Sequence, residues 1–516
     1  MRASAETGAE KGAGGRQRAL VPVLVFLGTV VAVISSLGAP MVPTIAAVDH
    51  VSLADAQWSL TVTMLVGAVA TPVMGRLGDG PHRRTVMLAA AATVLAGSVL
   101  AALPLGFPAL MAGRALQGVG LGLTPLAIAT ARDSVPGERS RSALAVLSLT
   151  TVAGVGLGYP LTGLIAQSLG VHAAFWFGAA ISAAALTAGI LVLPPTTHRP
   201  ARPLDVLGAC LLGTGLGGLL LALSEGEALG WTSPALLALA ATSVLLLLWW
   251  VRHELRTPHP LVDLRSLRNP VVLTADVAGL VAGIGMYLLM SLVTRFVQTP
   301  TSAGYGFGAS VTVAGLALLP FSAASILTSR IAPRLARRTG TAAILPIGCA
   351  VSLLATLAFL SGRDRLWELF AVMGLAGLGV GLTFAVMPGL IVGAVPAHET
   401  GSAISFNQVL RYVGYSTGSA LSGAVLQAHT PAGHALPTGD AYTAAALIGC
   451  AVWAVVGAAT IVLPRRGAAA ATAAPVRPAG PATAGAAATG NGLRITVRAA
   501  GGEAEGEGAR EEGAPA

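Results

Sequence analysis

Charged residues are scarce in this sequence. Only 10% of its 516 residues are Asp, Glu, Lys or Arg, whereas 54% are apolar. An average soluble domain carries roughly 25% charged residues. A folded globule of this composition would have little polar surface to present to water. The composition therefore excludes a soluble enzyme, and it also excludes a disordered protein.

Cysteine is equally scarce, with three residues in the whole chain. Cys210, Cys349 and Cys450 lie far apart, each inside an apolar run, and no CxxC or Cys/His spacing is present. This pattern excludes a disulfide-rich secreted module and predicts no metal site. A membrane-embedded enzyme would need clustered His, Asp or Cys within its apolar runs, and the sequence has no such cluster. We therefore expect a non-enzyme without a bound cofactor.

Basic residues outnumber acidic ones, 31 to 22, which gives a formal charge of +9. On a soluble protein this excess would indicate a nucleic-acid partner, but on a membrane protein it can simply record orientation. The placement of the charges decides between these two interpretations.

Long apolar runs fill most of the chain. A transmembrane helix needs roughly 20 mostly apolar residues, and about 14 runs meet that requirement. They lie near residues 20–48, 57–75, 85–103, 107–131, 141–166, 172–193, 205–224, 233–251, 271–297, 309–331, 341–360, 367–394, 402–427 and 441–463. The sequence therefore predicts an all-α integral membrane protein that contacts the lipid bilayer and not nucleic acid.

Arginines mark one side of this predicted array. Nearly all basic residues fall in alternate loops and in the two terminal segments, whereas the loops of the other side hold only Arg363 and Arg365. Because Lys and Arg accumulate on the cytoplasmic side, both termini are predicted to be cytoplasmic. The excess of basic residues thus mostly reflects the orientation of the chain in the membrane.

A repeat divides the chain. The stretch 118–124, GVGLGLT, resembles 377–383, GLGVGLT, and both copies end the fourth run of a block of six. We therefore predict two six-helix bundles with two inserted helices between them, and the substrate site between the bundles. The predicted parts are a cytoplasmic tail (1–19), the first bundle (20–194), the inserted helices with a cytoplasmic linker (195–270), the second bundle (271–463) and a disordered cytoplasmic tail (464–516).

Three motifs point to a family. The loop after the second run reads GRLGDGPHRR, the fourth run reads LMAGRALQGVG, and the fifth reads GVGLGYPLTG. Together they resemble the signature loop, the fourth-span arginine motif and the antiporter glycine motif of the major facilitator superfamily. The matching residues are Gly75, Asp79, Arg83 and Arg84 in the loop, Arg114 and Gln117 in the fourth run, and Gly154, Gly158 and Gly163, with Pro160 displaced by one position, in the fifth.

The resemblance covers roughly residues 20–465, and the two inserted helices resemble the 14-helix drug:proton antiporter branch. It implies a bacterial cytoplasmic-membrane transporter that exports small amphipathic, drug-like or antibiotic-like compounds in exchange for protons by alternating access. A proton-coupled symporter importing a small metabolite is the alternative. We expect a monomer driven by the proton gradient. The first run lacks the acidic residue common in that branch, which argues against a cation-binding role for it.

Charges inside apolar runs are costly and indicate function. Asp276 in the ninth run is predicted to take up and release the coupling proton, unless it lies at the membrane rim and pairs with Arg268. Arg114 is predicted to assist that coupling or to contact substrate, unless it bonds backbone carbonyls of a neighbouring helix. Three embedded arginines (Arg114, Arg295, Arg411) against one Asp favour neutral or anionic substrates over lipophilic cations.

Polar residues form a stripe in the thirteenth run, because positions 408, 411, 412 and 415 share one helix face. The alternative to a cavity lining is hydrogen bonding between helices. The predicted substrate-cavity residues are Gln117, Tyr287, Asn407, Gln408, Arg411, Tyr412 and Tyr415. By the family resemblance Gly75, Asp79, Arg83 and Arg84 form a conformational latch, and Gly154, Gly158, Pro160 and Gly163 serve helix packing.

Overall fold

The computed structural model describes residues 2–37, 41–196, 203–431 and 436–473, and within them every regular element is helical. The chain divides at residue 471 into two compact units, and the first, Met1–Ala471, holds the helical bundles. Among the described residues, 11 helices are long and apolar enough to cross a membrane. The helices α7 and α16 and the segment α5–η2–α6 lie outside those 11 but coincide with three further predicted spans.

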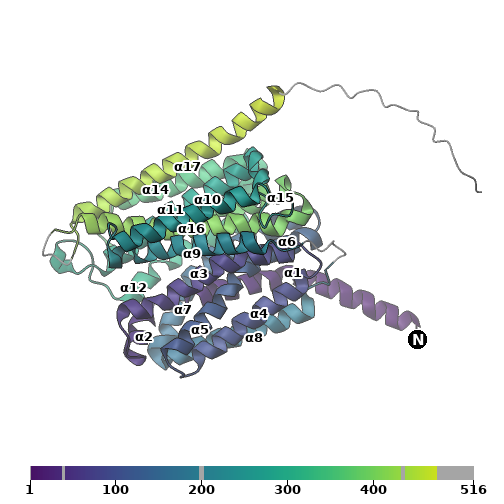
Figure 1. Cartoon of the computed structure of the whole chain (residues 1–516), viewed down its shortest axis with the longest axis horizontal. Helices are drawn as coiled ribbons and strands as arrows, with labels where there is room; N and C mark the ends of the chain where they lie inside the picture. The colour runs from purple at the N-terminus through teal and green to yellow at the C-terminus, as the bar shows by residue number, and fades with distance from the viewer. Residues whose placement is uncertain (1, 38–40, 197–202, 432–435, 474–516) are drawn as a thin grey trace, which may run out of the picture. The chain divides into compact units, whose positions relative to one another are not determined.

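The first bundle runs from α1 to α8 (Figure 1). Its elements are α1 (Arg2–Ser36), α2 (Val42–Val48), α3 (Leu53–Gly78), α4 (Arg83–Ala102), α5 (Phe107–Gly118), η2 (Val119–Gly122), α6 (Leu123–Ser134), α7 (Gly137–Leu169) and α8 (Val171–Val192). The predicted first span, 20–48, is wrong at its end, because α1 stops at Ser36 and α2 begins separately with Pro43 in its first turn. Proline is favoured at that position.

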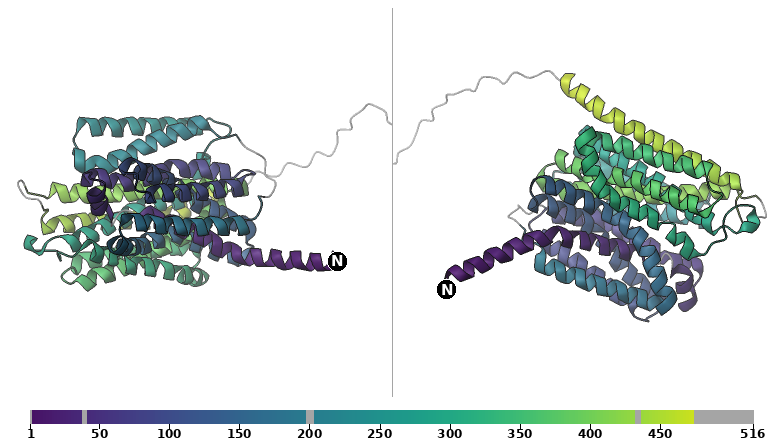
Figure 2. Two further views of the ribbon diagram at one scale, coloured as in Figure 1. Left: turned by 90° about the horizontal axis from the view of Figure 1, so that it is seen from below. Right: turned by 180° about the vertical axis from the view of Figure 1, so that it is seen from behind.

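The second bundle runs from α11 to α17. Its elements are α11 (Pro270–Gln298), η4 (Thr301–Ala303), α12 (Val311–Leu316), α13 (Leu319–Thr339), α14 (Thr341–Ser361), α15 (Leu366–Ala394), η5 (Ala397–Glu399), α16 (Thr400–Ala428) and α17 (Gly439–Ala473). The run 309–331, predicted as one span, falls in the single candidate span Thr312–Thr339. Within it the helix is interrupted between α12 and α13, and Pro320 lies in the first turn of α13. Figure 2 shows α17 along the outside of this bundle.

The predicted disordered tail, 464–516, begins too early. Helix α17 continues to Ala473, so residues 464–473 are helical. This stretch reads PRRGAAAATA, and its alanines have the highest helix propensity of any residue. The rest of the predicted tail lies outside the described residues.

The two inserted helices are α9 (Val206–Leu229) and α10 (Pro234–Glu254), followed by the short helix η3 (Leu264–Arg268). Helix α9 packs against α10 on one side and against both α3 and α16 on the other. The inserted pair therefore covers the seam where the first bundle meets the second. The other seam is formed by α7, which packs against α13 and α15.

Glycines of the predicted repeat occupy matching places in the two bundles. A Cβ atom on Gly118 would collide with α3, and one on Gly120 with α4. In the second bundle a Cβ atom on Gly377 would collide with α13, and one on Gly379 with α14. In each bundle the glycines let the helix of the fourth span approach the helices of the second and third spans closely. These neighbours are α3 and α4 in the first bundle and α13 and α14 in the second. The repeat is therefore structural as well as sequential.

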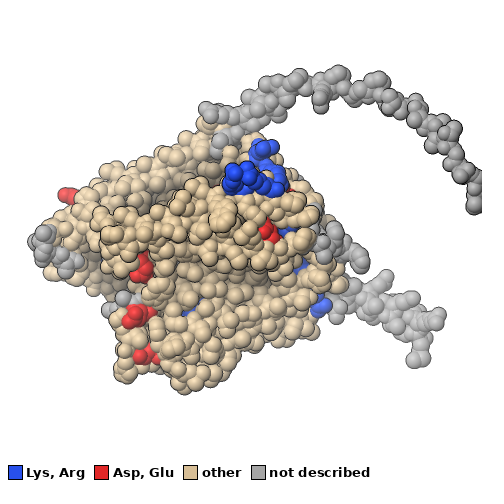
Figure 3. Space-filling model, viewed as in Figure 1, with Lys and Arg blue, Asp and Glu red and all other residues tan. Residues whose placement is uncertain are grey.

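The two ends of the helical array differ in charge and in the helix termini they carry. Helix α3 ends and α16 begins at one end, which we call the latch side, and the other end is called the far side. Lys and Arg side chains gather mainly toward one end of the visible face and Asp and Glu mainly toward the other (Figure 3). The loop between α3 and α4, which carries the predicted latch, lies on the latch side.

Candidate functional site

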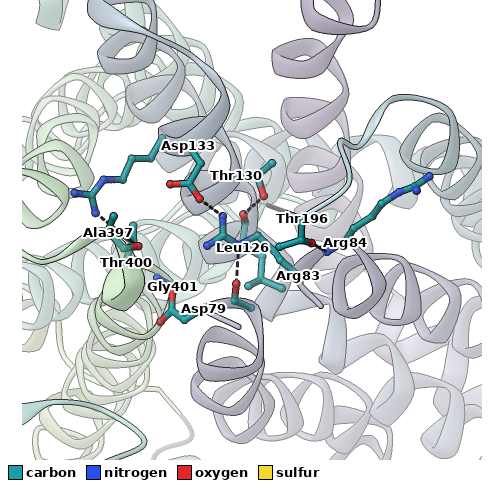
Figure 4. A network of polar contacts seen from close by, with 12 residues as sticks. Asp79, Arg83, Arg84, Leu126, Thr130, Asp133, Thr196, Ala397, Thr400 and Gly401 are labelled. Carbon is teal, nitrogen blue, oxygen red and sulfur yellow. Dashed lines mark hydrogen bonds and ion pairs between the residues drawn. The ribbon is translucent and has the colours of Figure 1, made fainter. Parts of the chain in front are cut away.

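Asp79 ties the first bundle to the second on the latch side (Figure 4). It lies directly after α3, and its carboxylate oxygens accept hydrogen bonds from the backbone N–H groups of Gly401 at 2.7 Å and Ser402 at 2.8 Å. The side chain thus occupies the N-terminus of α16, where a negative charge is favourable. Gly75 enables this contact, because a Cβ atom there would collide with Ser405 of α16.

The surroundings of Asp79 act on its pKa in opposite directions. Burial raises the pKa of the carboxyl above its ordinary value, while the hydrogen bonds from Ser402 and Gly401 lower it. Burial is the larger effect, so the net direction is upward.

The arginines of the predicted latch have separate partners. Arg83 forms an ion pair with Asp133 at the end of α6, 2.5 Å from Nη1, and its Nε donates to the carbonyl of Gly78. Arg83 therefore clamps the loop within the first bundle. Arg84 does not join this contact, since it donates to the carbonyl of Ile190 on α8.

A second tie between the bundles was not predicted from the sequence. Arg132, at the end of α6, donates to the carbonyl of Val395 at 3.2 Å and to the hydroxyl of Thr400. In the sequence Arg132 counted only as one of many arginines that mark orientation. No local sequence signal distinguishes Arg132 from the other arginines of that side, because its partners, the Val395 carbonyl and the Thr400 hydroxyl, lie far away in the sequence.

Arg114 is a structural residue of the first bundle. It is fully buried, and it donates to the backbone carbonyls of Ser59 on α3 and Ile34 on α1, both at 2.9 Å. It also bonds Gln117, whose amide donates to Ser98 on α4. The prediction that Gln117 lines the substrate cavity is therefore wrong, because its side chain is used between helices. For Arg114 the geometry matches the alternative of backbone bonding.

A cavity of about 650 Å³, which we call the main cavity, lies between the two bundles toward the far side, and another of about 620 Å³ lies between α7 and helices α13, α14 and α15 on the latch side. Four helices line the main cavity: α3 with Asp55 and Trp58, α9 with Ser224 and Glu225, α11 with Tyr287 and Arg295, and α16 with Tyr412, Tyr415 and Ser419. Tyr287 and Tyr415 stack with their ring centroids 4.6 Å apart. Three of the predicted cavity residues, Tyr287, Tyr412 and Tyr415, thus line the cavity, and its aromatic wall suits a planar apolar compound.

The rest of the predicted stripe does not line the cavity. Arg411 is 2% exposed, with its guanidinium 4.8 Å from the ring centre of Phe384 on α15. It donates to Gln408, but its Nε and Nη1 have no partner among the described residues, and neither do Gln408 Nε2 and Tyr415 Oη. Unsatisfied buried donors are costly and rare. Of these three side chains, Tyr415 is the one that also lines the main cavity.

Asp276 lies in the second bundle, apart from Arg114. It is 3% exposed and accepts a hydrogen bond of 2.9 Å from Asn407, which also donates to the carbonyl of Ala275. Asn407 thus holds α16 to α11 and does not line the main cavity. The alternative pairing of Asp276 with Arg268 is not found among the described contacts. A buried carboxylate with a neutral partner is suited to binding a proton.

The predicted packing glycines all lie in α7. Gly154 permits a close approach to α1, because a Cβ atom there would collide with Ala32. Gly158 is buried, and its carbonyl accepts a hydrogen bond from the hydroxyl of Thr162 at 2.6 Å. The side chain of Pro160 lies outside the described residues, and Gly163 follows on the same helix. No group of three or more His, Cys, Asp or Glu side chains in the described part of the chain could hold a metal ion.

These features define a polytopic membrane protein of two helical bundles joined by a latch. The chain belongs to the Major Facilitator Superfamily, whose sequence model matches residues 24–419 and 276–500. It is a multi-pass cell-membrane protein, and the family and its transporter-named relatives indicate a transporter rather than an enzyme.

Relatives extend this assignment. An uncharacterized MFS-type transporter of Mycobacterium tuberculosis is 30% identical over 421 residues, which cover 80% of this chain and 59% of that protein. The chain thus spans under two thirds of that relative. The methylenomycin A resistance protein of Bacillus subtilis is 28% identical over 412 residues, 78% of this chain and 86% of that protein. The tetracenomycin C resistance and export protein of Streptomyces glaucescens is 28% identical over 387 residues, 73% and 70% of the two chains.

A solved structure shares the fold. The human organic anion transporter MFSD10 (TETRAN) superposes with a TM-score of 0.60 and 18% identity, covering 86% of this chain and 99% of that one. At this identity the likeness concerns the fold alone.

Proposed function

We propose that this protein exports small amphipathic, drug-like or antibiotic-like compounds in exchange for protons by alternating access. The observation that carries the proposal is the tyrosine-walled cavity of about 650 Å³ between the bundles toward the far side, at the opposite end from the ties that Asp79 and Arg132 make on the latch side. The latch side also holds a cavity of about 620 Å³, at the other seam, between α7 and helices α13, α14 and α15. A cavity of this volume fits a drug-sized molecule.

In this proposal the latch side is cytoplasmic, there are 14 spans, and both termini are cytoplasmic. The gathering of basic side chains toward one end of the visible face supports the orientation (Figure 3). Alternating access then consists of breaking the ties of Asp79 and Arg132 and closing the far side around the aromatic wall. The protein works as a monomer, since each chain supplies both bundles.

Asp276 carries the coupling proton in this scheme. An ionised carboxylate at this depth costs several kcal/mol, so a proton bound there stabilises the buried state. The stacked tyrosines contact the planar part of the compound, and the hydroxyl of Tyr415, which lines the cavity, donates to an acceptor oxygen of the compound. The names of the antibiotic-resistance relatives support export of such compounds.

Transport by the purified protein in liposomes tests the proposal. A pH step is imposed across the membrane, and the movement of a panel of amphipathic dyes and antibiotics is followed. We expect proton entry to drive compounds in the opposite direction. The Asp276→Asn variant should lose this driven transport but still bind compound. Asp364→Asn, the same change at an exposed position, is the matched control and should behave as wild type.

Other outcomes discriminate among the alternatives. Movement of a compound together with the proton would identify the importing symporter instead. Driven transport by Asp276→Asn at the wild-type rate would assign the coupling proton elsewhere. Transport without any response to the pH step would refute proton coupling.

A further inference from the structure

Asp276 does not face the main cavity. Instead it lines a small crevice on the latch side, together with Ser266 of η3, Glu399 of η5 and Ala403 of α16. None of these residues lines the main cavity. The carboxylate and the proposed substrate site are thus reached from different directions, although both are bounded by α11 and α16.

The crevice suits proton transfer. Its volume is about 10 Å³, close to the space that one water molecule occupies. Two further carboxylates, those of Asp263 and Glu399, share its lining with Asp276. Each of these two carboxylates also has a basic neighbour, Arg265 at 3.7 Å from Asp263 and His398 at 3.2 Å from Glu399. A water molecule in the crevice can carry a proton from Asp276 toward this charged rim, whereas a drug-sized molecule cannot enter so small a space.

We propose that this crevice is the path by which Asp276 releases its proton to the latch side, separately from the path taken by the substrate. The inference rests on the proposed function, because it presumes that Asp276 carries the coupling proton. It adds a route and assigns relay positions to Asp263 and Glu399. Proton release then requires no opening of the main cavity toward the cytoplasm.

The latch and the crevice share a residue. Ser402 lines the crevice, and its backbone N–H donates to Asp79. The bond that ties the bundles together therefore also holds one wall of the proton path in place. When the latch opens and the start of α16 moves, this wall moves with it. Proton release thus depends on the position of the start of α16.

The inserted helices complete the opposite wall. Phe406 lines the crevice and contacts Trp250 of α10, with ring centroids 6.1 Å apart. Trp250 in turn donates from Nε1 to Glu254 at 2.8 Å, at the end of the same helix. Val262 and Asp263 of the segment that follows α10 also line the crevice. The inserted pair and its linker therefore help to enclose the proton path.

Two matched substitutions on α16 test this path. Ala403 lines the crevice and Ala420 lines the main cavity, so Ala403→Leu fills the first space and Ala420→Leu intrudes on the second. Each variant is assayed in liposomes for proton-driven transport and for counterflow, the exchange of labelled for unlabelled compound at equal pH. Counterflow needs substrate movement but no net proton transfer.

We expect Ala403→Leu to slow proton-driven transport by about 100-fold, the scale of a lost proton-transfer group, with counterflow retained. Ala420→Leu should slow both. Proton-driven transport by Ala403→Leu at the wild-type rate would overturn the path, and so would equal loss of both activities in a variant that folds normally. If wild-type protein shows counterflow but no proton-driven transport, the proposed function fails instead.

A chemical test avoids the risk that Ala403→Leu misfolds. The Ser266→Cys variant is treated from the latch side with a small charged thiol reagent. Wild-type protein, treated in the same way, is the control that measures the effect of modifying the three native cysteines. Modification should block proton-driven transport while counterflow continues, and bound compound should not protect the thiol. Protection by compound, or modification without effect on driven transport, would contradict a separate path.

Discussion

Two buried arginines show how the same residue type can serve stability or function. Arg114 has its hydrogen bonds satisfied by backbone carbonyls of α1 and α3 and by Gln117. Arg411 has one hydrogen bond and an aromatic face but two nitrogens without partners among the described residues. The first guanidinium holds helices together, whereas the second keeps donors free at a stability cost, as functional residues commonly do.

Replacing each arginine with methionine should separate these roles. Arg114→Met leaves the buried Oε1 of Gln117 without its donor, at about 1–3 kcal/mol, and removes the bonds that join α5 to the carbonyls of Ser59 and Ile34. Its melting temperature and folded yield should therefore fall. Arg411→Met removes a poorly compensated buried charge, so its melting temperature should stay equal or rise while transport is lost. Thermal unfolding in detergent and transport in liposomes measure the two effects. A fall in melting temperature for Arg411→Met as large as for Arg114→Met would contradict the assignment.

At the scale of elements, the latch joins the end of α3 to the start of α16 through a buried carboxylate. Burial raises the pKa of Asp79, so the closed latch binds a proton more tightly than an open latch with a hydrated carboxyl. The closed latch is therefore stabilised relative to the open latch at a pH below the ordinary pKa of Asp. This stabilisation is lost as the pH rises through the raised pKa that Asp79 has in the closed latch.

The latch should therefore close further on acidification. Spin labels on His82→Cys and His398→Cys, exposed positions on either side of it, report the separation of the bundles. As the pH falls from about 7 toward about 4, the ordinary value for Asp, the population at short distance should grow. In Asp79→Asn the distances should not change over this range. Growth of the long-distance population on acidification would contradict the prediction, as would an unchanged pH response in Asp79→Asn.

Hydropathy and motif spacing were sufficient to predict the helical class and the latch position. A loop motif is local, so it could single out Asp79, which the structure finds bonded to the start of α16. The stripe on α16 was only partly right, because helical periodicity shows that residues share a face but not how deep each lies. Tyr412 and Tyr415 reach the main cavity, while Asn407 bonds α11 and Arg411 lies against α15. The partners of Arg114 could not be predicted, since backbone carbonyls carry no sequence signal.

At the scale of the whole molecule, transport requires the two bundles to separate on the latch side. The two bundles meet along two lines of contact, which differ in structure. At one, α3 packs against α16 and α9 covers both helices, whereas at the other α7 packs directly on α13 and α15. Because the ties through Asp79 and Arg132 lie at the end of the molecule remote from the main cavity, they can open only when the bundles rock about their contact. A covalent bridge across the latch should therefore hold the cavity open toward the far side.

A reducible bifunctional thiol reagent that joins His82→Cys to His398→Cys supplies such a bridge. The bridged protein should stop transporting compound but still bind it from the far side, and reduction of the bridge should restore transport. Wild-type protein with its three native cysteines, and each variant with one of the two substitutions, treated alike, are the controls. Binding is followed by fluorescence of the bound compound, and transport by its movement across liposomes. Continued transport by the bridged protein would mean that the bundles do not separate at the latch. Loss of binding as well would mean that the cavity depends on latch movement.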